Sequence, residues 1–172
     1  MDTSLTLDMI YELPLKVISE SKEKGEFASM ISESICDKYD INDIKAKITL
    51  MFAKFNSVKY YYNMPISKTI RITPGYREKA LSKNEMRSKI DDAVSRKIDN
   101  MIWASEFYNS IIKLSKGLTY EEAYYLSYGL IACRSHEKIA EDLNISIRSI
   151  QPIKKSCLVK IWSALEIFYE ED

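Results

Sequence analysis

The sequence contains few residues that interrupt helices, with four glycines and four prolines among 172 residues. Long stretches between them place apolar residues at helical spacing, which favours an all-α fold. The sequence also has only three cysteines, Cys36, Cys133 and Cys157, which are odd in number and far apart, so we expect no disulfide framework. Cys133 and His136 have the spacing of zinc ligands. The second pair that a structural zinc site needs is missing, so we predict no metal or other cofactor.

Other absences narrow the function. The sequence has no glycine-rich phosphate-binding loop and no carboxylate pair outside an evident helix, so we predict that the protein is not an enzyme. It has no stretch of about 18 apolar residues, so we predict no membrane span. The first residues lack the basic and apolar pattern of a secretory signal, and a cytoplasmic location is the resulting expectation.

Charge is balanced over the whole chain, with 25 basic and 25 acidic residues, but it is distributed unevenly. Residues 143–160 include no acidic residue and four basic ones, which are Arg148, Lys154, Lys155 and Lys160. A basic helix inside a neutral chain is typical of a nucleic-acid contact, although a solvated helix face produces the same pattern.

The hydrophobic pattern divides the chain into three regions. Residues 1–41 are predicted to form short helices of unknown role. Residues 42–117 are predicted to form two long helices, joined by a basic linker at residues 64–83 that includes two prolines and a glycine. Residues 118–172 are predicted to form a helix-turn-helix DNA-binding domain, which begins with a helix capped by Thr119.

Each long helix has apolar residues separated alternately by four and three positions, the spacing of a heptad seam. Two such helices form either an antiparallel hairpin within one chain or a coiled coil between two chains, so a homodimer is an open alternative. The seam residues are Ile44, Ile48, Met51, Phe55, Val58 and Tyr62 in the first helix, and Val94, Ile98, Met101, Ser105, Tyr108 and Ile112 in the second.

Residues 135–151 have the pattern of two helices joined by a tight turn. In the first helix Ile139 and Ala140 share an apolar face, and the small alanine allows a second helix to cross closely. Asn144 tolerates the left-handed backbone that such a turn requires. Ser146 is a strong candidate for the cap of the second helix. This is the helix-turn-helix pattern of DNA-binding proteins, and an ordinary corner between two helices is the alternative.

Pro152 leaves two positions open for the start of the second helix. If Ser146 is the cap, the proline falls inside the helix, where it lacks the N–H that would bond the carbonyl four residues earlier. If Ser149 is the cap, the proline falls in the first turn, where it is tolerated. The second arrangement would move the base-reading surface toward Gln151, Lys154 and Lys155.

The expected DNA contacts follow from this motif. Arg148 and Gln151 are predicted to lie nearest the base edges, because arginine pairs with guanine and glutamine with adenine. The lysines are predicted to contact phosphates, which position the protein without reading the sequence, and Ser135 is a further phosphate contact. The complete set of predicted DNA-binding residues is Ser135, Ser146, Arg148, Ser149, Gln151, Lys154, Lys155 and Lys160.

A second candidate for the same motif lies near the N-terminus. Residues 27–39 have the apolar spacing of a helix, and residues 40–42 are predicted to form a turn and cap. The helix that follows would present Lys45, Lys47 and Lys54 on its surface.

A set of residues in the C-terminal third has the order of a known motif. These residues are Leu118, Thr119, Glu121, Glu122, Tyr128, Gly129, Glu137, Ile139, Ala140, Leu143, Ile145, Ser146, Arg148, Ser149 and Ile150. This part resembles the promoter-binding fourth region of bacterial sigma factors. With the linker residues 72–76 and the helix residues 89–94 and 97–99, the whole chain is similar to small regulators of phages and prophages of low-GC Gram-positive bacteria, of the RinA and ArpU groups. The similarity covers roughly residues 42–166.

The resemblance implies sequence-specific binding of double-stranded DNA and activation of late phage genes, such as those for packaging, structure and lysis. RNA polymerase is then a further expected partner. The chain has no promoter-melting region like that of a full sigma factor, which argues against an autonomous sigma factor. Two alternatives stay open: a small-terminase-like protein that recognises packaging sites, and a sigma-like factor that binds RNA polymerase without binding DNA.

Overall fold

The computed structural model describes residues 5–21, 30–63 and 83–169 of the chain. All regular elements in these ranges are helices, which confirms the predicted all-α class. They are α1 (Leu7–Glu20), α2 (Glu33–Cys36), α3 (Ile41–Asn63), α5 (Lys83–Ser115), α6 (Tyr120–Tyr124), the π-helical η1 (Tyr125–Ile131), α7 (His136–Leu143), α8 (Ile147–Leu165) and the 3-10 helix η2 (Glu166–Phe168). The predicted linker at residues 64–83 lies outside the described residues, apart from Lys83. None of the described helices has both the length and the hydropathy that crossing a membrane requires.

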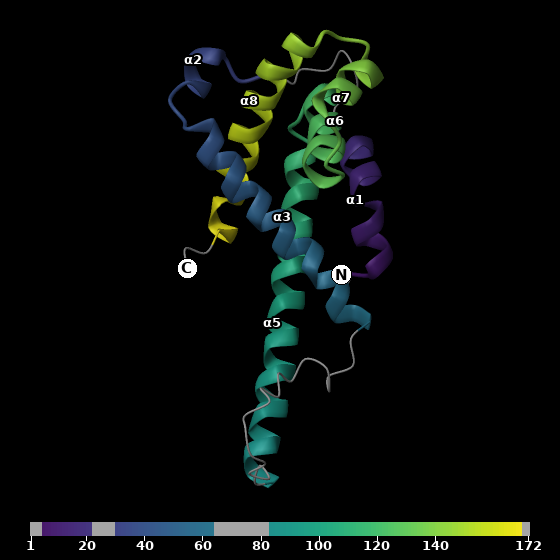
Figure 1. The fold of residues 1–172 in the computed structure, drawn as a ribbon, viewed down its shortest axis with the longest axis vertical. Helices are drawn as coiled ribbons and strands as arrows, with labels where there is room; N and C mark the ends of the chain where they lie inside the picture. The colour runs from purple at the N-terminus through teal and green to yellow at the C-terminus, as the bar shows by residue number, and fades with distance from the viewer. Residues whose placement is uncertain (1–4, 22–29, 64–82, 170–172) are drawn as a thin grey trace.

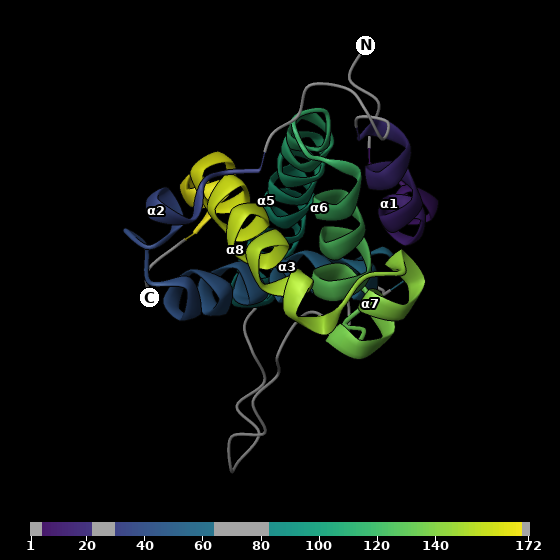
Figure 2. The ribbon, with the colours of Figure 1, turned by 90° about the horizontal axis from the view of Figure 1, so that it is seen from above.

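The longest helix, α5, forms the axis of the molecule (Figure 1). The helices α1, α3 and α8 all pack against it. Seen from above, α1 and α8 lie on opposite sides of α5 (Figure 2). The helix α3 crosses α5 obliquely, and the N-terminal half of α5 extends beyond the other helices (Figure 1). The helices α6 and α7 lie together at the opposite end of the molecule from this extension.

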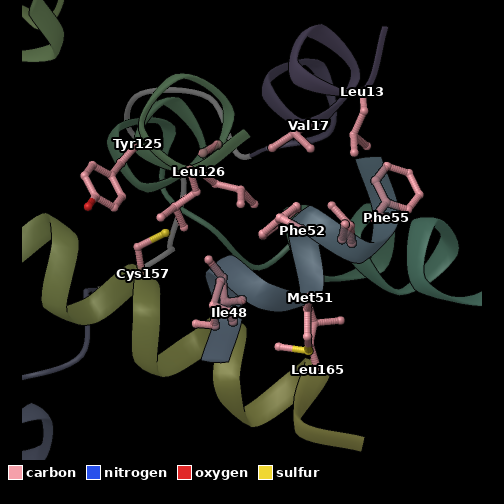
Figure 3. Packing of buried hydrophobic residues seen from close by; sticks show 14 of the residues in the cluster. Leu13, Val17, Ile48, Met51, Phe52, Phe55, Tyr125, Leu126, Cys157 and Leu165 are labelled. Atoms are coloured by element: carbon pink, nitrogen blue, oxygen red, sulfur yellow. The ribbon is translucent and has the colours of Figure 1, made fainter. Parts of the chain in front are cut away.

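One hydrophobic core joins the three regions that the sequence distinguishes (Figure 3). Residues from α1, α3, α5, η1 and α8 belong to the same buried cluster, and each is at most 1% exposed: Leu13, Phe55, Phe107, Leu126 and Leu158. The N-terminal helix α1, whose role the sequence leaves unknown, is therefore part of the structure that supports the C-terminal third.

Phe107 is the centre of an aromatic cluster within this core. Its ring centroid lies 4.9 Å from that of Trp103, 5.4 Å from Phe55, and 5.5 Å from both Phe52 and Phe168. Each favourable pair of aromatic rings contributes about 0.5–1.5 kcal/mol beyond the area that it buries. The cluster therefore fixes α3 and the C-terminal η2 against α5.

The first predicted seam is confirmed as a buried face of α3. This face packs against α8, α5 and α1. Its residues are Ile44, Ile48, Met51, Phe55 and Val58, all at most 4% exposed. The side chain of the sixth seam residue, Tyr62, lies outside the described residues.

The second predicted seam is buried only in part, since its residue Tyr108 is 7% exposed but Ile98 faces solvent. Ile98 is 51% exposed. The fully buried described residues of α5 are Ala104, Phe107, Ile111 and Ser115, and none of them belongs to the predicted seam. The reason is that α1, α3 and α8 contact the C-terminal half of α5 on different sides, so its burial does not follow one heptad stripe. Because α3 crosses α5 instead of running alongside it, the described residues do not form the predicted hairpin. A coiled coil between chains stays a prediction.

The N-terminal helices differ from expectation in one respect. The first of the short helices predicted within residues 1–41 is α1, which begins after the cap Thr6 and contains Pro14. The predicted helix at residues 27–39 is wrong in extent, because the described part of this range is helical only over α2. The segment before α2 is extended instead, and the Ile31 N–H donates to Ser156 Oγ of α8 at 2.7 Å.

Candidate nucleic-acid interface

The turn between α7 and α8 is built from local side-chain and backbone preferences. Ser135 caps α7, because its Oγ accepts a hydrogen bond from the Lys138 N–H at 3.3 Å. Asn144 ends α7 in the left-handed conformation, with φ 54° and ψ 45°. Ser146 caps α8 through a hydrogen bond of 3.2 Å from the Ser149 N–H to its Oγ. The predicted cap Ser146 and the predicted turn residue Asn144 are therefore confirmed.

The two helices pack closely through small and apolar residues. Ile139 and Ala140 of α7 and Ile150 of α8 are all at most 3% exposed. On the other side of α7, Gly129 of η1 leaves space for Ile139, because a Cβ on that glycine would lie 3.1 Å from Ile139 Cδ1. This packing fixes the direction in which α8 leaves the turn.

Pro152 lies inside α8, so the alternative in which Ser149 caps the helix is wrong. The helix begins at Ile147 and continues through Pro152 to Leu165. The proline has no N–H, so the Arg148 carbonyl lacks the donor that normally follows four residues later. Pro152 is exposed, and its ring does not displace the core.

The first two turns of α8 present polar side chains to solvent. Arg148, Ser149 and Gln151 are exposed, and the neighbouring Ile147 is 51% exposed. The Arg148 guanidinium has no hydrogen bond or ion pair with the described part of the chain. The structure therefore brings together, on one exposed surface, the residues predicted to read bases.

The three predicted lysines differ in environment. Lys154 is half-buried, and its pKa is lowered first by burial and then by the positive charge of Lys45. Lys155 Nζ lies 3.1 Å from Asp37 Oδ1 and 3.4 Å from Glu33 Oε1, so its pKa is raised. Glu33 of α2 and Asp37, which caps its C-terminal end, thus already neutralise Lys155 within the folded chain.

Lys160 supports the fold. Its Nζ lies 2.6 Å from Oε2 of Glu122, a carboxylate with no solvent exposure. Glu122 also accepts hydrogen bonds from Ser156 Oγ and, at 2.9 Å, from the Thr119 N–H. This network joins α6 to α8 and holds the Lys160 ammonium within the fold, and the predicted phosphate contact of Lys160 stays a prediction.

A cluster on α6, η1 and α7 was missed in the sequence. The Tyr124 hydroxyl donates to Asp142 Oδ2 at 2.9 Å, and Arg134 Nη1 lies 3.1 Å from the same oxygen. The Arg134 guanidinium also lies 4.3 Å from the centroid of the Tyr128 ring. Burial and the bond to Asp142 raise the pKa of Tyr124 to about 12. Nothing in the spacing of these residues predicts that they meet.

The second candidate motif, near the N-terminus, does not have the expected structure. Its first helix, α2, has only four residues. Lys47 pairs with Asp43 at 2.9 Å and lies over the Trp162 ring, and Lys54 lies over the Trp103 ring. Of the three lysines predicted to line its surface, Lys45 is the one whose positive charge lowers the pKa of both Lys154 and His136.

Comparison with known proteins adds no relative: no family model, no curated protein and no solved structure significantly matches this chain. The resemblance to sigma factors and phage regulators therefore rests on the residues named above.

Proposed function

We propose that the protein is a sequence-specific DNA-binding regulator that activates phage or prophage late genes. The observation that carries this proposal is the exposed start of α8, which follows a three-residue turn and presents the unpaired Arg148. An arginine without an internal partner at the start of a helix is suited to major-groove recognition. The gene class comes from the resemblance.

In the proposed complex, the N-terminal turns of α8 enter the major groove. Arg148 pairs with a guanine and Gln151 with an adenine. Ser135 and Ser149 are polar contacts to the DNA backbone, and Lys154 is the first lysine that follows them on α8. Lys155 contributes only where a phosphate displaces the acids of α2. RNA polymerase and a second copy of the chain are further proposed partners.

The experiment is selection of binding sites from a random duplex library, repeated at several salt concentrations. The protein is expected to enrich a defined sequence. Arg148→Ala should weaken binding to that sequence by about 1–3 kcal/mol and relax the preference at one position. The matched control is Arg96→Ala, because Arg96 bonds only a carbonyl of its own helix α5.

The outcomes separate the proposal from its alternatives. Arg148→Ala binding the enriched site as tightly as the unchanged protein would contradict the groove assignment. Salt-sensitive binding without an enriched sequence would favour the packaging alternative, and light scattering would then test for the large rings of small terminases. Capture of RNA polymerase without any binding to DNA would favour the polymerase-interacting alternative.

A further inference from the structure

Several lysines of this protein form an ion pair with an acidic residue. The described pairs include Lys16 with Glu20, Lys47 with Asp43, Lys138 with Glu141, Lys155 with Asp37, and Lys160 with Glu122, all between 2.6 and 3.1 Å. Lys45 and Lys154 differ, because neither side chain has an ion pair or a hydrogen bond with the described residues. The fold therefore leaves the Lys45 and Lys154 ammonium groups, both partly buried, without an anion among the described residues.

These two lysines flank the contact between three helices. The helix α8 packs against both α3 and α7. Lys154 follows Ile153 and lies one turn after Ile150, on the side of α8 that is buried. Lys45 follows Ile44 on the buried side of α3, and His136 lies one turn before Ile139 of α7. All three basic side chains are half-buried as a result.

The electrostatic environment of this cluster is positive. Burial and then Lys45 lower the pKa of Lys154, and no acidic group acts on it. Burial, then Lys154 and Lys45, lower the pKa of His136, and the adjacent Glu137 opposes this only weakly. Like charges that have lost part of their water destabilise a fold, and a bound anion relieves that cost.

We propose that Lys45 and Lys154, with His136 beside them, form a binding site for a phosphate oxyanion, and that a phosphodiester of the DNA backbone occupies it. This inference rests on the proposed function for the identity of the ligand. Arg148 and Lys154 are six residues apart on α8, which is about 9 Å along the helix axis. That span suits one side chain in the major groove and the other at the phosphates that border it. The DNA surface then includes α3, which lies outside the C-terminal third.

The first arm of the test uses inorganic phosphate and no DNA. Thermal unfolding of the full chain is measured with and without phosphate, at matched ionic strength in chloride. Phosphate at ten times its Kd is expected to raise the Tm of the unchanged protein by about 3–5 °C. The double variant Lys45→Gln/Lys154→Gln should lose this rise, whereas Lys113→Gln, at an exposed lysine of α5, should keep it. Lys154→Arg, which retains the charge, should respond like the unchanged protein.

The second arm measures duplex affinity against salt concentration for the same variants. Each Lys→Gln change should reduce the slope of log K against log salt by about one, and by a similar amount on every DNA sequence.

A phosphate response in the double variant equal to that of Lys113→Gln would overturn the oxyanion site. A lost phosphate response with an unchanged salt slope would support the site and overturn the DNA backbone as its ligand. If the unchanged protein binds no duplex while phosphate stabilises it through these lysines, the proposed function fails and the site stands.

Discussion

Glu122 shows how one residue connects distant parts of this chain. Its carboxylate is fully buried and is shared by Lys160, Ser156 and the backbone of Thr119. Ser156 also accepts a hydrogen bond from the Ile31 N–H, so the network extends from α6 through α8 to the segment before α2. Buried charges are tolerated only where such partners replace water.

Glu122→Ala is expected to reduce the free energy of unfolding by about 2–4 kcal/mol, because it leaves the Lys160 ammonium without its carboxylate. Urea denaturation followed by circular dichroism measures the loss. Adding Lys160→Met should recover part of it, since the unpaired charge is then removed. The control is Glu121→Ala in the same turn, which should change stability by no more than about 0.5 kcal/mol. Equal losses from the two single variants would show that the buried network is not stabilising.

Tyr124 gives the fold a pH dependence on the alkaline side. Burial and the hydrogen bond to Asp142 raise its pKa to about 12, above the value of about 10 in an unfolded chain. The folded state holds the proton more tightly, so this contribution to stability is complete below pH 10 and is lost as the pH rises toward 12. Between pH 9.5 and pH 11.5 the free energy of unfolding of Tyr124→Phe should therefore fall less than that of the unchanged protein. The size of this difference is set by the rise in the pKa of Tyr124 on folding.

Denaturation midpoints across this pH range measure the difference. Tyr120→Phe is the matched control, because the Tyr120 ring contacts Tyr124 but its hydroxyl has no hydrogen bond in the described chain. Parallel pH profiles for Tyr124→Phe and the unchanged protein would contradict the assignment.

At the scale of elements, the π-helical η1 packs against both α1 and α7. At its end the Ala132 N–H donates a hydrogen bond to the Ser127 carbonyl, five residues earlier, at 3.0 Å, which is the spacing of a π-helix. The Ser127 hydroxyl is buried and donates to the Pro14 carbonyl of α1 at 2.9 Å. On its other side, η1 meets α7 at Gly129, where the missing Cβ leaves room for the Ile139 side chain.

Gly129→Ala is expected to destabilise the protein by about 1–2 kcal/mol, although alanine is intrinsically the better helix former. The added Cβ would lie 3.1 Å from Ile139 Cδ1 and 3.1 Å from the Tyr125 ring, and both neighbours are fully buried and cannot move aside. In an Ile139→Val background, which removes that methyl group, the same change should cost less. Thermal unfolding of the unchanged protein, the two single variants and the double variant measures the coupling between the two positions. Strictly additive effects would show that contact with Ile139 does not cause the loss of stability.

At the scale of the whole molecule, a single core predicts that distant regions unfold together. Leu13→Ala in α1 should reduce the free energy of unfolding by about 2–4 kcal/mol, because Leu13 is fully buried in the shared cluster. Trp162 fluorescence, recorded in a Trp103→Phe background, reports on α8. Its unfolding midpoint should shift by the same amount as the midpoint of the total helix signal. Leu15→Ala is the control on the same helix, at a side chain that is 64% exposed.

An unchanged Trp162 midpoint in Leu13→Ala would mean that residues 118–172 fold independently, as the division into sequence regions suggests. A common shift would mean that α1 stabilises the helices that carry the proposed DNA surface. Changes in α1 would then alter DNA binding through stability and not through contact with DNA.

The elements that the sequence predicts well depend on neighbouring residues. The cap at Ser146 and the left-handed Asn144 follow from side-chain and backbone preferences that act over about one helical turn. The seam of α3 was also predictable, because one continuous face of that helix is buried. The register of α5 was not predictable, since its burial depends on three helices that approach from different sides.

The sequence by itself determined the all-helical class and the local geometry of the turn before α8, because both arise from interactions between residues close along the chain. Only the tertiary structure decided which basic residues are free to meet an anion. The partner of Lys155 is Asp37, 118 residues away, and that of Lys160 is Glu122, 38 residues away. Lys154 has no acidic partner among the described residues, and the positive charge of Lys45 from α3 lowers its pKa. Spacing along a helix cannot distinguish these three lysines, because their charges are paired or left unpaired by helices that meet only in the folded chain.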